Sequence, residues 1–449
     1  MKVETKRLTF DHILTPAGTL SRQSLLIGED GRISALEDAG DRPSDGFFAL
    51  PGMPNAHSHS FQRALCGYGE AAQAEDAGKD SFWSWREHMY RLAGKITEQD
   101  LYVIATQAFA EMLAAGFTSV AEFHYLHHRV DGARSPAMGQ AVIAAAQDTG
   151  IRLLLLPVLY RRGGFAEPPG AAQSRFVHDE IDDFCALLEQ LSAARLGFAP
   201  HSLRAVAVED LAAILAAVDS VLGADYPVHI HISEQQREVE ACIAHHGARP
   251  LEVLAKHVEL GPRWNLVHGT HFSPAELALA SDNHCQVVLC PLTEASLADG
   301  IFPATDFQRL GGCWAIGSDS NARIDPIEEL RLLEYGQRLR DGLRARLAGE
   351  QSLGATLWQQ ACDGGAAALA MPVGRLEAGF FADLTVLGKT GVLNGPAPER
   401  LADALIVGGS RQDVAAVYVG GELRARDGAA LGGSADQQTK YAATIARLL

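Results

Sequence analysis

The sequence predicts an α/β protein, a (β/α)8 TIM-type barrel with a small β-sandwich domain built from both chain termini. Short apolar, strand-like runs alternate with helical stretches through the middle of the chain, which is typical of parallel β/α architecture. Eight such runs can be counted. Both ends of the chain instead carry glycine-bounded strand patterns, and no long helical pattern separates those near the C-terminus. We therefore expect the two ends to complete one β domain.

The first fifty residues predict short strands and turns. Within residues 21–36, the apolar run Leu25-Leu26-Ile27 and the segment around Ile33 flank an acidic glycine turn, a pattern that predicts a β-hairpin. Strand-like segments at 379–387 and 417–423 offer partners for it. We expect the small β domain to comprise residues 1–50 and 373–433, with the barrel over 51–372. Residues 434–449 predict one amphipathic C-terminal helix with Ser434 as its N-cap.

The middle of the chain supplies the predicted barrel strands. They are Leu50–Asn55, Phe117–Phe123, Ile151–Leu159, Leu196–Pro200, Pro227–Ile232, Asn265–Val267, Gln286–Leu289 and Cys313–Ile316. Between the first two runs, a threonine start, an acidic first turn and a glycine stop predict a helix within Thr97–Gly116. A doubly wound open sheet is the alternative, but no Gly-x-Gly-x-x-Gly turn follows the first strand.

Composition excludes several classes of partner. The 449 residues include 38 Lys and Arg against 55 Asp and Glu, a net charge of −17, which argues against nucleic acid and anionic membrane surfaces as partners. The longest strongly apolar run, Leu153–Leu156, is far too short to span a membrane. Seven scattered cysteines without a Cys-x-x-Cys motif, and no secretory signal pattern, predict a cytoplasmic protein.

Reactive side chains follow six of the predicted strands. Catalytic groups of a (β/α)8 barrel lie at the carboxyl ends of its strands. His57 and His59 end the first run with one residue between them, so both side chains point the same way. The remaining ends carry Glu122 and His124; His201 and Arg204; His229, His231 and Glu234; His268; and Asp319.

These groups suit metal-assisted hydrolysis. Three imidazoles and a carboxylate leave one coordination position for a water molecule, which the ion acidifies. His57, His59, either His229 or His231, and Asp319 supply that set. Glu234 is placed for general acid–base catalysis, and His268 for holding hydroxide or polarising the scissile group. Because no lysine ends the fourth run, a binuclear centre bridged by a carbamylated lysine is not expected.

Taken together, His57-Ser58-His59, His231-Ile232-Ser233-Glu234, His268 and Ser318-Asp319 resemble the mononuclear deaminase branch of the amidohydrolase superfamily. In that branch the third histidine ligand precedes the catalytic glutamate by three residues, which selects His231. The resemblance implies one divalent ion, Zn²⁺ by default with Fe²⁺ and Mn²⁺ as alternatives, and a homodimer. The implied metal ligands are His57, His59, His231 and Asp319, and the implied catalytic residues are Glu234, His268 and Asp319.

A narrower similarity, to the formimidoylglutamate deiminase family, rests on the segments Pro51–Ala64, Phe82–Arg86, Glu122–His128, Ala199–Arg204 and Pro227–Gln235. It implies hydrolysis of N-formimino-L-glutamate to N-formyl-L-glutamate and ammonia, a step of histidine degradation. The implied substrate-binding residues are Gln62, Arg86, Tyr125, His201 and Arg204.

The two arginines suit such a substrate because guanidinium groups pair with carboxylates in a bidentate manner, and this substrate carries two. Structural roles are the alternatives: Arg86 stacking on Trp83 or Trp85, and Tyr125 and Gln62 packing behind the site. A deaminase of a heteroaromatic base such as guanine is the alternative function, with aromatic and amide groups expected in place of the arginines. A catalytically inactive barrel would lack ligands, and none is missing. Further histidines expected in solvent are His127, His128, His245 and His246.

Overall fold

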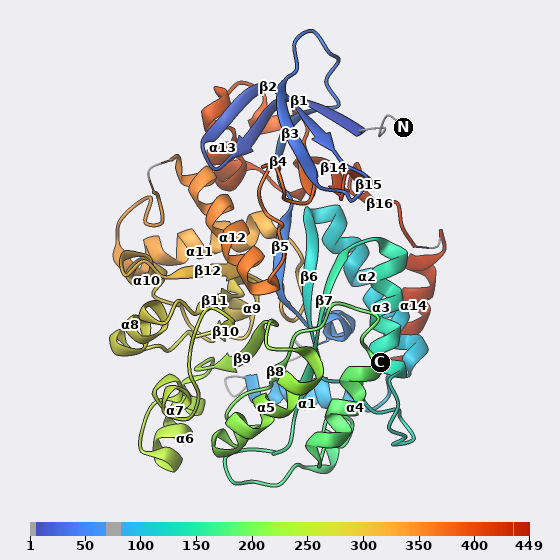
Figure 1. Cartoon of the computed structure of the whole chain (residues 1–449), viewed down its shortest axis with the longest axis vertical. Helices are drawn as coiled ribbons and strands as arrows, with labels where there is room; N and C mark the ends of the chain where they lie inside the picture. The colour runs from blue at the N-terminus through green and yellow to red at the C-terminus, as the bar shows by residue number, and fades with distance from the viewer. Residues whose placement is uncertain (1–5, 69–81, 350, 434) are drawn as a thin grey trace.

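The computed structural model describes residues 6–68, 82–349, 351–433 and 435–449. It is a mixed α/β structure in which parallel strands and their helices lie beside a separate sheet formed near the two chain ends (Figure 1). Among the described helices, none combines the length and the apolar character needed to cross a membrane.

Eight parallel strands form two curled four-stranded sheets, and the predicted catalytic residues lie at their carboxyl ends. One contains β5 (Met53–Ser58), β6 (Phe117–His124), β7 (Arg152–Leu159) and β8 (Ala199–Pro200). The other contains β9 (Val228–Ile232), β10 (Trp264–His268), β11 (Gln286–Leu289) and β12 (Cys313–Ile316). Isolated parallel bridges join the sheets on both sides, through the pairs Phe198 and Val228, Ser202 and His231, and Ser58 and Asp319. All eight predicted runs contain strand residues, so this expectation is confirmed.

The first predicted run divides between two sheets. Leu50 and Pro51 end β4 (Gly46–Pro51) of the terminal sheet, and Met53 begins β5. Gly52 marks the crossing, and a Cβ atom there would lie 2.3 Å from the side chain of Thr118. The short connection lets one apolar run serve both sheets, which is why the pattern predicted a single strand.

Helices cover the outer faces of the parallel strands. In chain order the described helices are η1 (Ser60–Leu65), α1 (Phe82–Ala93), α2 (Glu98–Ala115), α3 (Ala137–Thr149), α4 (Ile181–Gln190), α5 (Leu211–Leu222), α6 (Gln236–His246), α7 (Pro250–His257), α8 (Pro274–Asp282), α9 (Pro291–Ser296), α10 (Ala304–Arg309), α11 (Pro326–Asp341), α12 (Leu353–Leu369), α13 (Leu401–Gly408) and α14 (Gln437–Leu448), with short 3₁₀ turns between some of them.

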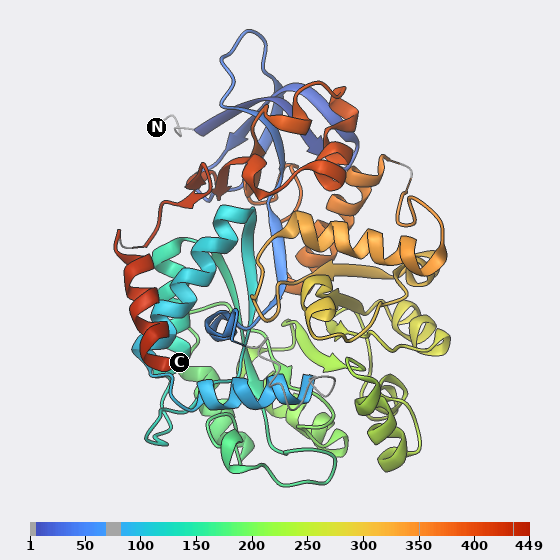
Figure 2. The same cartoon turned by 180° about the vertical axis from the view of Figure 1, so that it is seen from behind.

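The ends of α2 follow the sequence prediction. Thr97 caps its start and forms a capping box with Asp100, and Gly116 ends it with a φ of 107°. The C-terminal helix begins at Gln437, later than expected, and Ser434 lies outside the described residues. Figure 2 shows α14 lying along α2, where Gln437 Nε2 donates to the Val103 carbonyl oxygen at 2.8 Å.

The terminal sheet combines strands from both ends of the chain. Its order is β16-β15-β14-β13-β4-β1-β2-β3. Besides β4, these are β1 (Lys6–Thr15), β2 (Gly18–Ile27), β3 (Ile33–Asp38), β13 (Leu384–Leu387), β14 (Val414–Val419), β15 (Glu422–Arg426) and β16 (Ala429–Ala430). The predicted hairpin is the antiparallel pair β2 and β3, and β13 pairs antiparallel with β4. These strands form one continuous hydrogen-bonded sheet, so the sandwich stays a prediction.

Two hydrophobic cores match the two sheet systems. The larger lies between the parallel strands and their helices, and the smaller, with Phe10, Leu25 and Val386 among its members, lies against the terminal sheet. The parts are also joined by an ion pair, since Arg152 Nη2 at the start of β7 lies 3.0 Å from Oδ1 of the buried Asp383. The terminal sheet thus packs at the amino ends of the parallel strands. The candidate active site lies at their carboxyl ends.

Candidate active site

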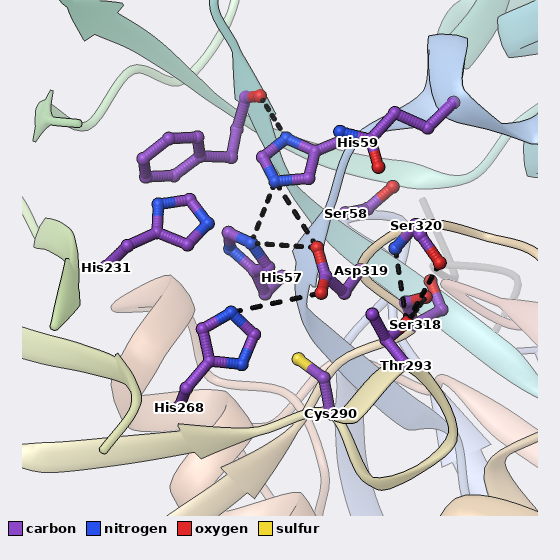
Figure 3. A network of polar contacts seen from close by, with 12 residues as sticks. His57, Ser58, His59, His231, His268, Cys290, Thr293, Ser318, Asp319 and Ser320 are labelled. Atoms are coloured by element: carbon purple, nitrogen blue, oxygen red, sulfur yellow. Dashed lines mark hydrogen bonds and ion pairs between the residues drawn. The ribbon is translucent and has the colours of Figure 1, made fainter. Parts of the chain in front are cut away.

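Three predicted ligands meet where β5 and β12 end. Nε2 of His57 lies 3.1 Å from Nε2 of His59, and Asp319 Oδ1 lies 3.4 Å and 3.3 Å from these two nitrogens (Figure 3). All three side chains are buried. Residues more than 250 positions apart in the chain therefore share one small volume, as the strand-end pattern predicted.

His231 and His268 complete the cluster. One ligand atom from each of His57, His231, His268 and Asp319 lies within 4.8 Å of the others. That group contains His268, to which the sequence assigned a catalytic role, while His59 adjoins it through His57 and Asp319. His229 is directed elsewhere, because its Nε2 lies 2.9 Å from the carbonyl oxygen of Ala368.

Backbone carbonyls fix the orientation of two imidazoles. Nδ1 of His59 lies 2.9 Å from the carbonyl oxygen of Phe123, and Nδ1 of His231 lies 3.1 Å from that of His201. Because a carbonyl oxygen only accepts hydrogen bonds, Nδ1 carries the hydrogen in each ring and Nε2 keeps its lone pair. In His59 that lone pair faces another ring nitrogen and a carboxylate, and such a group of acceptors requires a cation or protons.

Burial keeps these imidazoles neutral. It lowers the pKa of His57 to about 3 and also lowers the pKa of His59 and of His231. Burial opposes ionisation of Asp319, but the hydrogen bond from His57 and the nearby imidazoles outweigh it and lower the carboxyl pKa below its usual range. Neutral imidazoles beside an ionised carboxylate are a donor set that fits a divalent transition-metal ion.

Unusual backbone conformations position the strand-end residues. Ser233, His268 and Asp319 have φ angles of 52°, 71° and 44°, in a region that non-glycine residues rarely adopt. The cost of such a conformation is accepted mainly where the surrounding structure enforces it. Sequence patterns contain no signal for this strain.

A buried polar network enforces the position of Asp319. The Asn55 side chain donates to Ser318 Oγ at 2.6 Å and accepts from Ser318 N at 3.0 Å. Ser318 Oγ in turn donates to Asn321 Oδ1 at 2.6 Å, and Asn321 Nδ2 donates to Ser58 Oγ at 3.1 Å. The network ties β5 to the segment after β12. We did not identify Asn55 or Asn321 from the sequence, although both lie next to predicted strand ends.

Glu234 and His268, for which catalytic roles were predicted, lie next to each other in the cluster. Burial raises the pKa of Glu234 to about 7. His268 Nε2 lies 3.7 Å from Glu234 Oε1 and 3.9 Å from Asp319 Oδ2, and has no hydrogen-bond partner among the described residues. Burial opposes protonation of His268, but the surrounding carboxylates, Glu234 first among them, outweigh it and raise its pKa to about 10.

Glu294 holds the other side of the His268 ring. Its Oε1 lies 3.3 Å from His268 Nδ1 and accepts a hydrogen bond of 2.8 Å from Cys290 N. The sequence analysis missed Glu294 because it lies inside α9 rather than at a strand end. Its carboxylate fixes the ring so that Nε2 faces Glu234 and Asp319.

All five predicted substrate-binding residues line one pocket above the cluster. The pocket lining includes Gln62, Arg86, Tyr125, His201 and Arg204, together with His59, His231, Glu234 and Asp319. Aromatic residues that we did not predict form much of the remaining wall: Phe82, Trp85, Tyr90, Tyr160 and Phe176. The predicted substrate-binding residues thus share one cavity with residues of the buried cluster.

The arginines occupy different settings in this pocket. Arg204 Nη2 lies 3.9 Å from Glu234 Oε2, and Arg204 Nε lies 3.7 Å from Oε1 of the buried Glu238. Arg86, on α1, has its guanidinium carbon 5.6 Å from the centre of the Tyr90 ring. The side chain of Trp83, one suggested stacking partner, lies outside the described residues.

Two of the histidines expected in solvent are buried, which corrects the prediction. His127 Nε2 lies 2.8 Å from the Val158 carbonyl oxygen, and His128 Nε2 lies 2.7 Å from that of Val177. Both rings pack against His178, with centroids 4.9 Å and 4.8 Å away. The pair follows β6 and turns inward beneath a loop that the sequence did not predict. His245 is exposed, as expected, whereas His246 is partly buried.

Several known proteins are similar to this chain in sequence or in structure. A formimidoylglutamate deiminase of Pseudomonas aeruginosa is 43% identical over 436 residues, which cover 93% of this chain and 94% of that protein. An 8-oxoguanine deaminase of the same species is 28% identical over 435 residues, or 91% of this chain and 90% of the relative. The crystal structure of an amidohydrolase from Brucella melitensis matches with a TM-score of 0.89 and 36% identity, covering 98% of this chain and 99% of that one.

The model of the amidohydrolase family matches residues 48–424. The match spans β5 to β12 and every residue of the cluster described above. This chain therefore belongs to the amidohydrolase family.

Proposed function

We propose that this chain catalyses the metal-dependent hydrolytic deimination of N-formimino-L-glutamate to N-formyl-L-glutamate and ammonia, a step of histidine degradation. One observation carries the proposal: Arg86 and Arg204 line the same pocket as the buried histidine–aspartate cluster and Glu234. Guanidinium groups match carboxylates, and this substrate has two. The relative that is 43% identical carries the same activity in its name.

The cluster fits a single divalent ion. His57, His59, His231 and Asp319 would hold it, with the neutral imidazoles and the ionised carboxylate as donors. We propose Zn²⁺, because three nitrogen ligands and one oxygen ligand suit it well. When bound, such an ion lowers the pKa of a water molecule and so supplies a nucleophile at neutral pH.

Glu234 moves protons during the reaction. With a pKa of about 7, its carboxylate can accept a proton from the attacking water and later release it at the same pH. The oxygen adds to the formimino carbon, and Glu234 delivers this first proton to the imino nitrogen, which becomes an amino group. Asp319 accepts the second proton from the hydroxyl group of the intermediate as the carbonyl forms. That proton passes through Glu234 to the amino nitrogen, the bond between carbon and this nitrogen breaks, and ammonia leaves.

His268 stabilises the tetrahedral intermediate. Its Nε2 faces the space between Glu234 and Asp319, and Glu294 holds Nδ1 on the opposite side of the ring. A protonated ring in this position donates a hydrogen bond to the oxygen that adds to the substrate. Its role is electrostatic, so it complements the proton transfers of Glu234.

The substrate-binding residues would hold the two carboxylates. Arg86 and Arg204 provide the charge, and Tyr125, His201 and Gln62 provide polar groups on the same wall. Gln62 Nε2 donates to the Tyr125 hydroxyl at 2.8 Å, which orients that hydroxyl. The same arginines disfavour the guanine-type alternative, because a neutral base offers them no anionic partner.

Product analysis tests the proposal. Purified protein is incubated separately with N-formimino-L-glutamate and with guanine, and ammonia and the organic product are quantified. We expect equal amounts of ammonia and N-formyl-L-glutamate from the first compound and no ammonia from the second. Release of formamide and glutamate, or ammonia from guanine alone, would refute the assignment.

We also propose the closure of the barrel, the domain boundaries, the cellular location and the oligomeric state. Bridges on both sides of the two parallel sheets support a closed (β/α)8 barrel over 51–372. The separate smaller core supports a β-sandwich domain of 1–50 and 373–433, with 434–449 as an appended helix. The seven free cysteines support a cytoplasmic location. A homodimer follows from the family resemblance alone, and sedimentation analysis would test it.

A further inference from the structure

Two phenols in the pocket have no part in the mechanism above. Tyr90, on α1, and Tyr160, directly after β7, line the pocket together with Arg86 and Arg204. Tyr160 is buried, and its ring centroid lies 4.8 Å from that of His201. Both side chains therefore belong to the wall that carries the proposed carboxylate-binding residues.

A buried glutamine contacts both hydroxyls. Gln173 Oε1 accepts a hydrogen bond of 2.8 Å from Gly170 N, which settles the orientation of the amide. Its Nε2 therefore faces the phenols, 2.7 Å from the Tyr160 hydroxyl and 3.3 Å from the Tyr90 hydroxyl. Because an amide nitrogen can only donate, both phenol oxygens act as acceptors toward Gln173.

The two phenols together carry two hydroxyl hydrogens. Each phenol oxygen accepts from Gln173, so each hydroxyl keeps its own hydrogen for donation. In the part of the chain that the structure describes, no side chain or carbonyl outside the pair accepts either hydrogen, and one hydroxyl can donate to the other. Burial raises the pKa of Tyr160, so this phenol keeps its hydrogen at neutral pH. One O–H donor is thus left beside two guanidinium groups.

We propose that Gln173, Tyr160 and Tyr90 form a donor relay that binds one carboxylate of the substrate together with Arg86 and Arg204, and so determines specificity for a dianion. Gln173 is a positioning residue, since it acts through the phenols. The inference rests on the proposed function and adds residues to its carboxylate site. An anion fits this end of the pocket because the relay and both arginines offer it only donors.

Substitutions that remove or reverse the relay test the proposal. Tyr90→Phe and Tyr160→Phe each remove a hydroxyl, and Gln173→Glu replaces two donors by an acceptor that draws the phenol hydrogens away from the pocket. For N-formimino-L-glutamate we expect KM to rise about tenfold in each variant, with kcat within about twofold, because one hydrogen bond to an anion is lost. Tyr226→Phe is the matched control, since its hydroxyl donates to Asp219 away from the pocket.

Two analogues with one carboxylate identify what the relay binds. N-formimino-4-aminobutyrate lacks the α-carboxylate, and N-formimino-L-2-aminobutyrate lacks the side-chain carboxylate. We expect the variants to retain their KM penalty with one analogue and to match the wild type with the other. Unchanged KM for the full substrate, equal penalties on both analogues, or a loss confined to kcat would each overturn the relay.

The outcome for the relay is separable from that for the function. An active wild type with unaffected Tyr90→Phe and Tyr160→Phe variants would overturn the relay and leave the proposed function standing. A wild type that releases no ammonia from N-formimino-L-glutamate would overturn both. The phenylalanine variants keep their ring packing, so they decide the matter even if Gln173→Glu fails to fold.

Discussion

The two ends of the pocket carry side chains of opposite hydrogen-bonding character. At the inner end, His57, His59, His231 and Asp319 direct acceptors toward one another, and backbone carbonyls hold two of the rings. At the outer end, arginines and phenols offer donors from α1 and from the segments after β7 and β8. The inner end suits a cation and bond breaking, and the outer end suits anion binding. Changes at the inner end should therefore reduce kcat, and changes at the outer end should raise KM.

The largest effect is expected from removing an inner ligand. His231→Ala should reduce the metal content well below one ion per chain and lower kcat/KM about 10⁴-fold, because the activated nucleophile is lost. Elemental analysis and the ammonia assay would measure both. His229→Ala is the matched control from the same strand, since its ring contacts Ala368 instead, and it should keep the metal. Equal metal loss in both variants would contradict the selection of His231.

Glu234→Gln should separate catalysis from metal binding at the same end. The amide retains the shape of the carboxylate but cannot carry the proton, so we expect kcat to fall about 10²- to 10⁴-fold. Metal content should remain at the wild-type level. A variant with nearly full kcat would show that another group transfers the proton.

At the outer end, Arg204→Ala should act mainly on KM. Loss of a guanidinium–carboxylate pair is expected to raise KM about 10- to 100-fold, with a much smaller change in kcat. Arg204→Lys should restore only part of the affinity, because a lysine lacks the bidentate geometry. Steady-state kinetics with N-formimino-L-glutamate measure both variants, and an unchanged KM would remove Arg204 from the carboxylate site.

The smallest expected effect concerns the stability of the folded protein and a buried histidine behind the outer end of the pocket. His178 lies near the pocket residue Phe176, and burial lowers its pKa from 6.5 to about 3. In the unfolded chain this histidine takes up a proton below pH 6.5, so the free energy of unfolding should fall with acidification from about pH 6.5 toward 3, by about 1.4 kcal/mol per pH unit for each such group.

Thermal unfolding of His178→Phe between pH 7 and 5 would test this support. The pH dependence of its Tm should be shallower than that of the wild type, because one proton fewer is taken up on unfolding. The exposed His245 provides the control, and His245→Phe should leave the slope unchanged. Identical slopes in all three proteins would show that His178 does not contribute.

Sequence reasoning recovered the inner end better than the outer end, for a physical reason. Parallel strands place their carboxyl ends on one side, so the positions of His57, His268 and Asp319 follow from their order along the chain. The eight strands and the limits of α2 followed in the same way from periodicity and caps. The residues that hold the cluster in place, Asn55, Asn321 and Glu294, could not be predicted. Their roles depend on tertiary contacts, which leave no local pattern in a single sequence.

At the outer end, the five residues implied by the family resemblance line the pocket, but the remaining wall depended on tertiary contacts, and so did the division of strands in the terminal sheet. Tyr160 and Gln173 lie 13 positions apart, with no motif between them, and meet only because the loop after β7 folds back. His127 and His128 were expected in solvent, yet the segment 175–178 covers them. In the terminal sheet, Leu50–Asn55 predicted one strand although the chain crosses between sheets at Gly52.

Activity measured against metal occupancy tests the central claim most directly, namely that residues from 57 to 319 gather around one catalytic cation. Protein stripped with a chelator is titrated with Zn²⁺ while ammonia release from N-formimino-L-glutamate is recorded. Activity should begin near zero, rise in proportion to bound metal and level off at one ion per chain, and His231→Ala should show no such rise. Full activity in the stripped protein would contradict the claim.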